Sequence, residues 1–142
     1  MKLTSKEKKL IVKAIEAAEH LTSGEIRVHL SYSKSEENPL LQAQTQFEKL
    51  KMHLTKNRNG VLLYINPNAR KFALFGDDGI HAKVGQQYWN TLKDKLKTKI
   101  QEKDLTSGIV HAVEELGIQL KVHFPHSDSD QNRLNNEVSE SN

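Results

Sequence analysis

The stretch Val61-Leu-Leu-Tyr-Ile65 is an unbroken apolar run near the middle of the chain. It is bounded by the polar stretch Lys56-Asn-Arg-Asn-Gly60 and by Asn66-Pro-Asn-Ala69, whose residue types favour a turn. A short run without polar alternation predicts a strand that is covered on both faces. Helices are therefore expected on both sides of the sheet that contains it.

The segments next to this strand predict a sheet of mixed direction. Residues 25–33 alternate apolar and polar side chains, which is typical of a strand with one buried face. An amphipathic helix that begins at Asn38-Pro39 connects them to the central strand, and this order predicts a right-handed parallel crossover. Residues 70–75 follow the turn and predict an antiparallel return.

Helical patterns occupy most of the remaining chain. Thr4 and Glu7 have the spacing of a capping box in front of a first helix. Apolar residues recur every three or four positions over residues 84–100 and again over residues 105–120, where Gly117 indicates a close backbone approach. The sequence therefore predicts an α/β fold, a three-layer α/β/α sandwich with a small mixed parallel/antiparallel sheet.

Length and charge divide the chain into a body and a tail. The 142 residues suit one domain, and 36% hydrophobic with 27% charged residues can form a core. Residues 126–142 hold four carboxylates against one arginine, a net charge of −3, so residues 1–125 carry +6 of the overall +3. We expect a domain over residues 1–125 and an acidic, disordered tail over residues 126–142, which are polar and lack periodicity.

Several function classes are excluded by composition. There is no cysteine, so thiol nucleophiles, thiolate zinc sites and disulfides are ruled out. Neither GxxxxGK[ST] nor GxGxxG occurs, so nucleotide binding has no motif support. The lysines of residues 93–103 have helical spacing and are interspersed with acids, which favours a solvated face over nucleic-acid binding. No apolar run reaches membrane-spanning length. We expect a cytoplasmic monomer with neither a membrane nor a specific nucleic-acid partner.

The acidic doublet Asp77-Asp78 is the strongest local candidate for a functional site. Two adjacent carboxylates at a strand end repel one another unless they are solvated, cap a helix or share a cation, and oxygen ligands suit calcium or magnesium. The alternative is structural, with one aspartate capping the next helix while Gly76 and Gly79 serve the turn. Glu25 opens the first strand and Asn59 precedes the central one, so parallel pairing would bring both toward a common edge of the sheet.

Four blocks of sequence resemble the TPM domain family: Thr22-Ser-Gly-Glu-Ile26, Arg58-Asn-Gly-Val-Leu-Leu-Tyr-Ile65, Arg70-Lys-Phe-Ala-Leu-Phe-Gly-Asp77 and Phe124-Pro125. This domain recurs in bacterial proteins, in a plant thylakoid-lumen protein of photosystem II repair and in an animal receptor auxiliary protein. The resemblance covers about residues 5–125 and implies an α/β/α domain that often binds calcium or another divalent cation. It also implies acid phosphatase activity, as proposed for the plant member. We expect a stand-alone, cytoplasmic bacterial form of the domain.

Three functions are suggested by these residues and this resemblance. The first is non-catalytic binding of Ca²⁺ or Mg²⁺ by Asp77, Asp78, Glu25 and Asn59. The second is a metal-assisted acid phosphatase acting on phosphomonoesters, in which the same carboxylates hold the ion and Arg58 or Arg70 holds the phosphate. The third is a protein-interaction module whose basic body or acidic tail recruits a protein partner.

Overall fold

Strand β2 (Gly60–Asn66) lies inside the sheet, and all of its residues are buried. The computed structural model describes residues 2–126 and 138–142. In it β2 pairs in parallel with β1 (Glu25–Ser31) and antiparallel with β3 (Lys71–Gly76), while β4 (Ser139–Ser141) pairs in parallel with the other side of β1. The strand order is β3-β2-β1-β4, so the predicted mixed sheet is confirmed.

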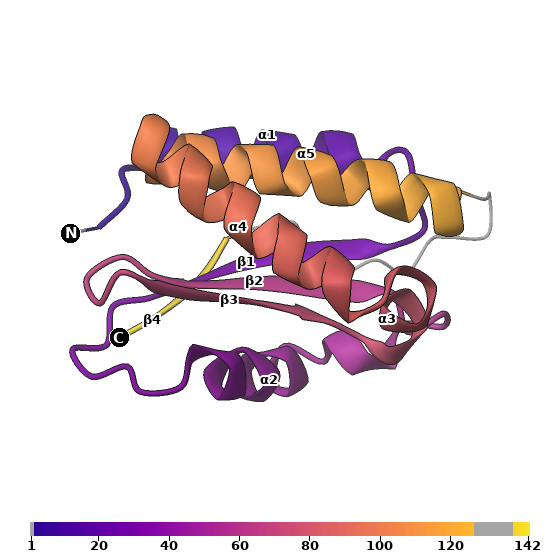
Figure 1. The fold of residues 1–142 in the computed structure, drawn as a ribbon, viewed down its shortest axis with the longest axis horizontal. Helices are drawn as coiled ribbons and strands as arrows, with labels where there is room; N and C mark the ends of the chain where they lie inside the picture. The colour runs from indigo at the N-terminus through magenta and orange to yellow at the C-terminus, as the bar shows by residue number, and fades with distance from the viewer. Residues whose placement is uncertain (1, 127–137) are drawn as a thin grey trace.

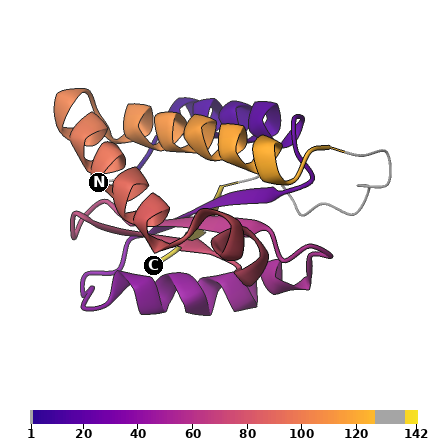
Figure 2. The same ribbon diagram turned by 45° about the vertical axis from the view of Figure 1, so that its right-hand side comes forward.

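Helices cover both faces of this sheet, as the burial of β2 requires. Helices α1, α4 and α5 lie on one side, and α2 lies on the other (Figure 1). Figure 2 shows the same layers in a turned view, with α3 at the end of β3. The predicted α/β/α sandwich is confirmed. The helix bounds are α1 Ser5–Glu19, α2 Pro39–Lys49, α3 Asp78–Val84, α4 Gln86–Glu102, α5 Leu105–His123 and the short 3-10 helix η1 Met52–Leu54.

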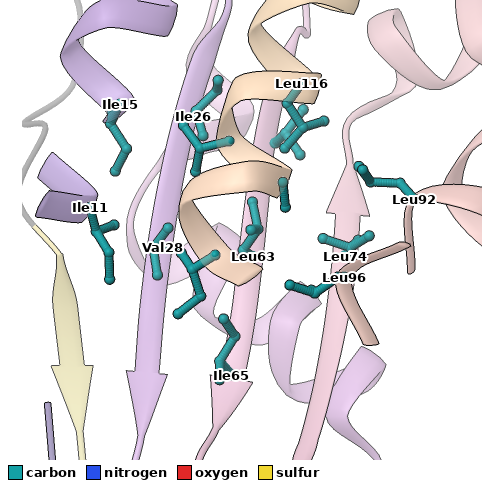
Figure 3. Packing of buried hydrophobic residues seen from close by; sticks show 14 of the residues in the cluster. Ile11, Ile15, Ile26, Val28, Leu63, Ile65, Leu74, Leu92, Leu96 and Leu116 are labelled. Carbon is teal, nitrogen blue, oxygen red and sulfur yellow. The ribbon is translucent and has the colours of Figure 1, made fainter. Parts of the chain in front are cut away.

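The largest core cluster fills the space between the sheet and the layer of three helices (Figure 3). Side chains from seven helices and strands meet there, and most of them are fully buried. The labelled members are Ile11 and Ile15 of α1, Ile26 and Val28 of β1, Leu63 and Ile65 of β2, Leu74 of β3, Leu92 and Leu96 of α4, and Leu116 of α5. Alternate residues of β1 and β2 point into this cluster, so their neighbours face α2.

The predicted helix starts are confirmed in atomic detail. The Glu7 carboxylate accepts a hydrogen bond from the Thr4 amide at 2.9 Å, and the Thr4 hydroxyl accepts one from the Glu7 amide at 3.1 Å. The Asn38 side chain accepts from the amide of Leu41 at 3.0 Å, with Pro39 as the first helical residue. These caps satisfy amides that have no partner within the helix.

Two boundaries differ from the predicted ones. The first strand ends at Ser31 rather than at residue 33. The helical pattern that begins at Val84 is divided, because Val84 ends α3 and Gly85 adopts φ 78° before α4 starts. Residues with a side chain rarely adopt that backbone region, whereas glycine does so without penalty. The spacing of four residues between apolar side chains continues from Val84 into α4, so the sequence pattern does not reveal the break in the helix at Gly85.

The expectation of a disordered tail is wrong for its last residues. Ser139–Ser141 form β4, in register with residues 29–31 of β1. A polar segment orders here because His29, Tyr32 and Lys8 bind its side chains. Residues 127–137 of the predicted tail lie outside the described residues, and the domain boundary at residue 125 stays a prediction. Within the part of the chain that the structure describes, no helix combines the length and apolar character of a membrane span.

We predict that Gly117→Ala destabilises the protein, although alanine is the better helix former. A Cβ at Gly117 would lie 2.7 Å from the Cβ of Ala18, because α5 and α1 touch at this point. Overpacking of this kind costs about 1–3 kcal/mol, more than the gain of about 1 kcal/mol in helix propensity. Urea unfolding measures the difference. The cost should shrink in an Ala18→Gly background, and an equal cost in both backgrounds would contradict the contact.

We also predict that acidification destabilises the protein through His29. Burial, and secondarily the charge of Arg27, lowers the pKa of His29 from 6.5 to about 4, while Glu140 opposes the shift. The unfolded chain therefore takes up a proton before the folded one, so stability is present above pH 6.5 and is lost as pH falls toward 4. Between about pH 7.5 and about pH 5 the free energy of unfolding should fall by about 2 kcal/mol.

Urea unfolding of the wild type and of His29→Gln at both pH values tests this expectation. Ordinary carboxylates titrate below about pH 4.5 and contribute little in this interval. The variant should lose most of the pH dependence. Identical pH dependence in the two proteins would show that His29 is not its source.

Candidate functional site

Three polar residues lie at the same end of three neighbouring strands. Glu25 is the register partner of Gly60, its amide donates to the carbonyl of Asn59 at 3.4 Å, and the Asp77 amide donates to the carbonyl of Gly60 at 2.9 Å. We call Glu25, Asn59 and Asp77 the strand-end rim. Since neighbouring strands are about 4.8 Å apart, the backbones of Glu25 and Asp77 are separated by about 10 Å.

The alternation of side chains places Glu25 and Asp77 on the α2 side of the sheet. A Cβ on Gly60, the register partner of Glu25, would lie 3.3 Å from both the Phe47 ring and the Met52 carbonyl, which belong to α2 and η1. A Cβ on Gly76 would instead strike Trp89 of α4, so the next residue, Asp77, faces the opposite side. Both side chains therefore lie on the same face of the sheet.

All three rim residues are buried, with exposed fractions of 4% for Glu25, 1% for Asn59 and 2% for Asp77. A buried carboxylate is costly unless positive charge or hydrogen-bond donors surround it. The side-chain amide of Asn59 donates to the Ser23 hydroxyl at 3.3 Å. Ser23 lies just before β1 and Asn59 lies just before β2, so this hydrogen bond connects the segments that lead into the two strands.

The guanidinium of Arg58 neutralises Asp77. Arg58 Nε donates to Asp77 Oδ2 at 2.6 Å and Arg58 Nη2 donates to Asp77 Oδ1 at 2.8 Å. The amide of Asp78 also donates to Asp77 Oδ1 at 2.8 Å, so Asp77 caps α3. The capping alternative is therefore confirmed for Asp77, and these contacts raise the pKa of Arg58 above its ordinary value.

The backbone of the Arg58 loop holds the first turn of α3 in place. Arg58 adopts φ 50°, in the left-handed region, and its carbonyl accepts from the Ile80 amide at 3.3 Å. A Cβ on Gly79 would lie only 2.0 Å from the carbonyl oxygen of Asn57. Only glycine fits at that position, which explains the second glycine of the Gly-Asp-Asp-Gly stretch.

The two aspartates of the doublet have opposite environments. The side chain of Asp77 is 3% exposed, whereas that of Asp78 is 93% exposed. Asp78 Oδ2 nevertheless lies 4.0 Å from Arg58 Nη2, the same nitrogen that binds Asp77. One guanidinium therefore faces both carboxylates, from the solvent side of the rim.

The structure separates the two arginines that were expected to hold phosphate. Arg58 precedes β2 and Arg70 follows it, in the β2–β3 turn, so the whole seven-residue strand lies between them. A strand of that length spans about 23 Å. Arg58 is thus the arginine beside the rim carboxylates, and a phosphate clamp formed by both arginines does not exist in this fold.

Sequence reasoning missed a second buried network at the opposite end of β2. The carboxylate of Glu36, a residue that is 8% exposed, accepts hydrogen bonds from the Tyr64 hydroxyl at 2.7 Å and from the side-chain amide of Asn66 at 3.1 Å. The Lys71 ammonium donates to the backbone carbonyl of Glu36 at 2.5 Å. Burial is the main cause that raises the pKa of Tyr64 to about 12. This network fastens the loop before α2, and no sequence spacing signals it.

The donor set of the rim suits a hard cation, with one condition. Carboxylate and amide oxygens are the ligands that Ca²⁺ and Mg²⁺ prefer. Among the described residues, no group of three or more histidines, aspartates and glutamates is arranged around a metal position. The positive charge at Asp77 comes from Arg58. The rim fits a divalent cation if that cation takes the place of the guanidinium.

An α/β/α domain with polar strand ends is the class of protein that this fold and rim define. Residues 2–119 match the family model described as the TPM domain, and the chain therefore belongs to the TPM domain family. A search of curated proteins finds no match.

Solved structures of bacterial proteins share the fold. The chain is 37% identical to the BA42 protein of the psychrophilic bacterium Bizionia argentinensis, with a TM-score of 0.88 and coverage of 99% of this chain and 96% of that one. The N-terminal domain of cg2496 from Corynebacterium glutamicum is 14% identical, with a TM-score of 0.65 and coverage of 94% and 81%. A P. gingivalis N-terminal domain is 15% identical, with a TM-score of 0.70 and coverage of 88% and 82%. The last two show similarity of fold alone.

We predict that the two aspartates differ in their effect on stability. Asp77→Ala removes the cap of α3 and the partner of Arg58, and should lower the free energy of unfolding by about 1–3 kcal/mol. Asp78→Ala, at an exposed position, should change it by less than about 0.5 kcal/mol. Urea unfolding of both variants provides the measurement. Equal destabilisation by the two variants would contradict the division of the doublet.

Proposed function

We propose that this TPM domain binds a divalent cation, Ca²⁺ or Mg²⁺, at the strand-end rim, in the place that the Arg58 guanidinium holds in this structure. Asp77 and Asp78 would be the principal ligands, with Glu25 and Asn59 behind them. The observation that carries the proposal is the position of one guanidinium nitrogen, 2.8 Å from the Asp77 carboxylate and 4.0 Å from the Asp78 carboxylate. A cation at that point has two carboxylates in front of it.

Exchange of Arg58 for a metal ion is favoured by the exposure of the two partners. The Arg58 side chain is 48% exposed, whereas the Asp77 side chain is 3% exposed. The arginine can therefore move into water while the carboxylate stays in the protein. Asp77 keeps a positive partner in both states, so neither state leaves a buried charge without compensation.

The proposed role is binding without catalysis. In the phosphatase alternative the ion and the phosphate would both need the rim, with an arginine holding the phosphate. Arg70 lies at the far end of β2, and Arg58, once the cation has displaced it from Asp77, has no fixed position beside the ion. These positions favour a binding site over a hydrolytic one.

Calcium and magnesium titrations followed by thermal unfolding test the proposal. The melting temperature should rise with metal concentration, and saturation at a hundredfold excess over the dissociation constant adds about 2.7 kcal/mol. Asp77→Asn should abolish the rise. Arg58→Gln should bind the cation more tightly, on the order of tenfold, because it removes both a competitor and a like charge.

Arg70→Gln is the matched control, since it makes the same change of charge at the far end of β2. It should leave the affinity within about twofold of the wild type, because the distance exceeds a Debye length. The proposal would be refuted if millimolar calcium and magnesium left the melting temperatures of both the wild type and Arg58→Gln unchanged. Equal tightening by both arginine variants would reduce it to a general charge effect.

A further inference from the structure

The outer edge of β1 is covered by a three-residue strand from the C-terminus of the chain. His29, Leu30 and Ser31 are the register partners of Ser139, Glu140 and Ser141, and the Tyr32 amide donates to the Ser141 carbonyl at 2.9 Å. This pairing lies toward the end of β1 opposite Glu25, so its role is independent of the proposed cation site. The backbone bonds would accept many sequences, and selectivity must come from side chains.

On the α2 side of the sheet, the edge binds two hydroxyl groups. His29 Nδ1 lies 2.8 Å from Ser139 Oγ, and His29 Nε2 lies 2.8 Å from Ser141 Oγ. The ring is 2% exposed and stacks on Tyr64 at 5.7 Å with an interplanar angle of 12°. A neutral imidazole needs one acceptor and one donor, and a hydroxyl can supply either. Residues without a hydroxyl would leave a buried ring nitrogen without its bond.

On the opposite side, the edge binds a carboxylate and an apolar side chain. Glu140 accepts from Lys8 Nζ at 2.9 Å and from the Tyr32 hydroxyl at 2.8 Å. Val138 packs, partly buried, against the main core cluster. The edge therefore contacts four consecutive side chains, which are apolar, hydroxyl, carboxylate and hydroxyl in that order.

We propose that the outer edge of β1 is a recognition site for an extended segment of this pattern, which the chain's own Val138 to Ser141 fills and which a partner protein bearing the same pattern can fill instead. The mode is strand addition to the edge of a sheet. The resident strand is three residues long, and both side chains of its Lys8–Glu140 ion pair are about one third exposed, so a competing segment has to replace only the contacts of these few residues. Without a strand on it, this edge would expose unpaired backbone N–H and C=O groups of β1 as well as the His29 ring, so a bound strand is favoured.

The test uses the full chain and a synthetic peptide of residues 137–142, EVSESN. Glu140→Lys should displace the resident strand, because it places a cation beside Lys8, and the ring nitrogen NMR signals of His29 should then move. The peptide should bind this variant on the order of tenfold more tightly than the wild type, where the tethered strand competes. Binding should return the His29 signals toward their wild-type positions.

Two controls make the result specific. Glu114→Lys makes the same charge change at an exposed position of α5 and should behave as the wild type. A peptide in which both serines are alanine should bind the Glu140→Lys variant at least about tenfold more weakly than EVSESN, because it loses both bonds to His29. Equal binding of the two peptides, or no binding to a variant whose His29 signals have moved, would overturn the proposal.

If Glu140→Lys leaves the His29 signals unchanged, the triple variant Ser139→Ala, Glu140→Lys, Ser141→Ala removes the bonds of both serines to His29 as well as the ion pair with Lys8. The same peptide titration then applies. His29 signals that stay at their wild-type positions in the triple variant would show that these side chains do not select the strand, which also overturns the proposal.

Discussion

The ion pair between Arg58 and Asp77 is the interaction on which the candidate site depends. The Asp77 carboxylate is almost fully buried, so it requires a positive partner, and Arg58 supplies one through two hydrogen bonds of 2.6 and 2.8 Å. The same carboxylate caps α3, and the Arg58 carbonyl accepts from Ile80 in that helix. The same carboxylate therefore both binds the arginine and caps the first turn of α3, so the two features depend on each other. Whatever replaces the guanidinium must also carry positive charge.

The buried central strand explains why these groups meet. Because β2 is covered on both faces, it must lie between helices, and β1 and β3 must pair on its two sides. A parallel neighbour and an antiparallel neighbour bring the start of β1 and the end of β3 to the same edge as the start of β2. Glu25, Asn59 and Asp77 are brought together by that topology, although up to 52 positions separate them in the sequence.

Local chemistry made much of the fold predictable from the sequence. The Thr4 and Asn38 caps and the close approach at Gly117 each depend on residues near in sequence or on the absence of one side chain. The pairing of Arg58 with Asp77 was not predictable, because the two residues are 19 positions apart in the sequence and the contact depends on the left-handed backbone conformation of Arg58. Strand β4 was missed for a similar reason, since a polar tripeptide has no pattern of its own and orders only against His29, Lys8 and Tyr32.

The central claim is that a divalent cation and the Arg58 guanidinium compete for Asp77. The Nε–H signal of Arg58 in ¹⁵N-resolved NMR spectra reports this contact directly, because Nε donates to Asp77 Oδ2. On addition of calcium the signal should move toward the position of a solvated arginine and exchange faster with water, together with shifts of the Asp77 and Asp78 amides. An Arg58 Nε–H signal that stays fixed while calcium saturates the protein would contradict the account.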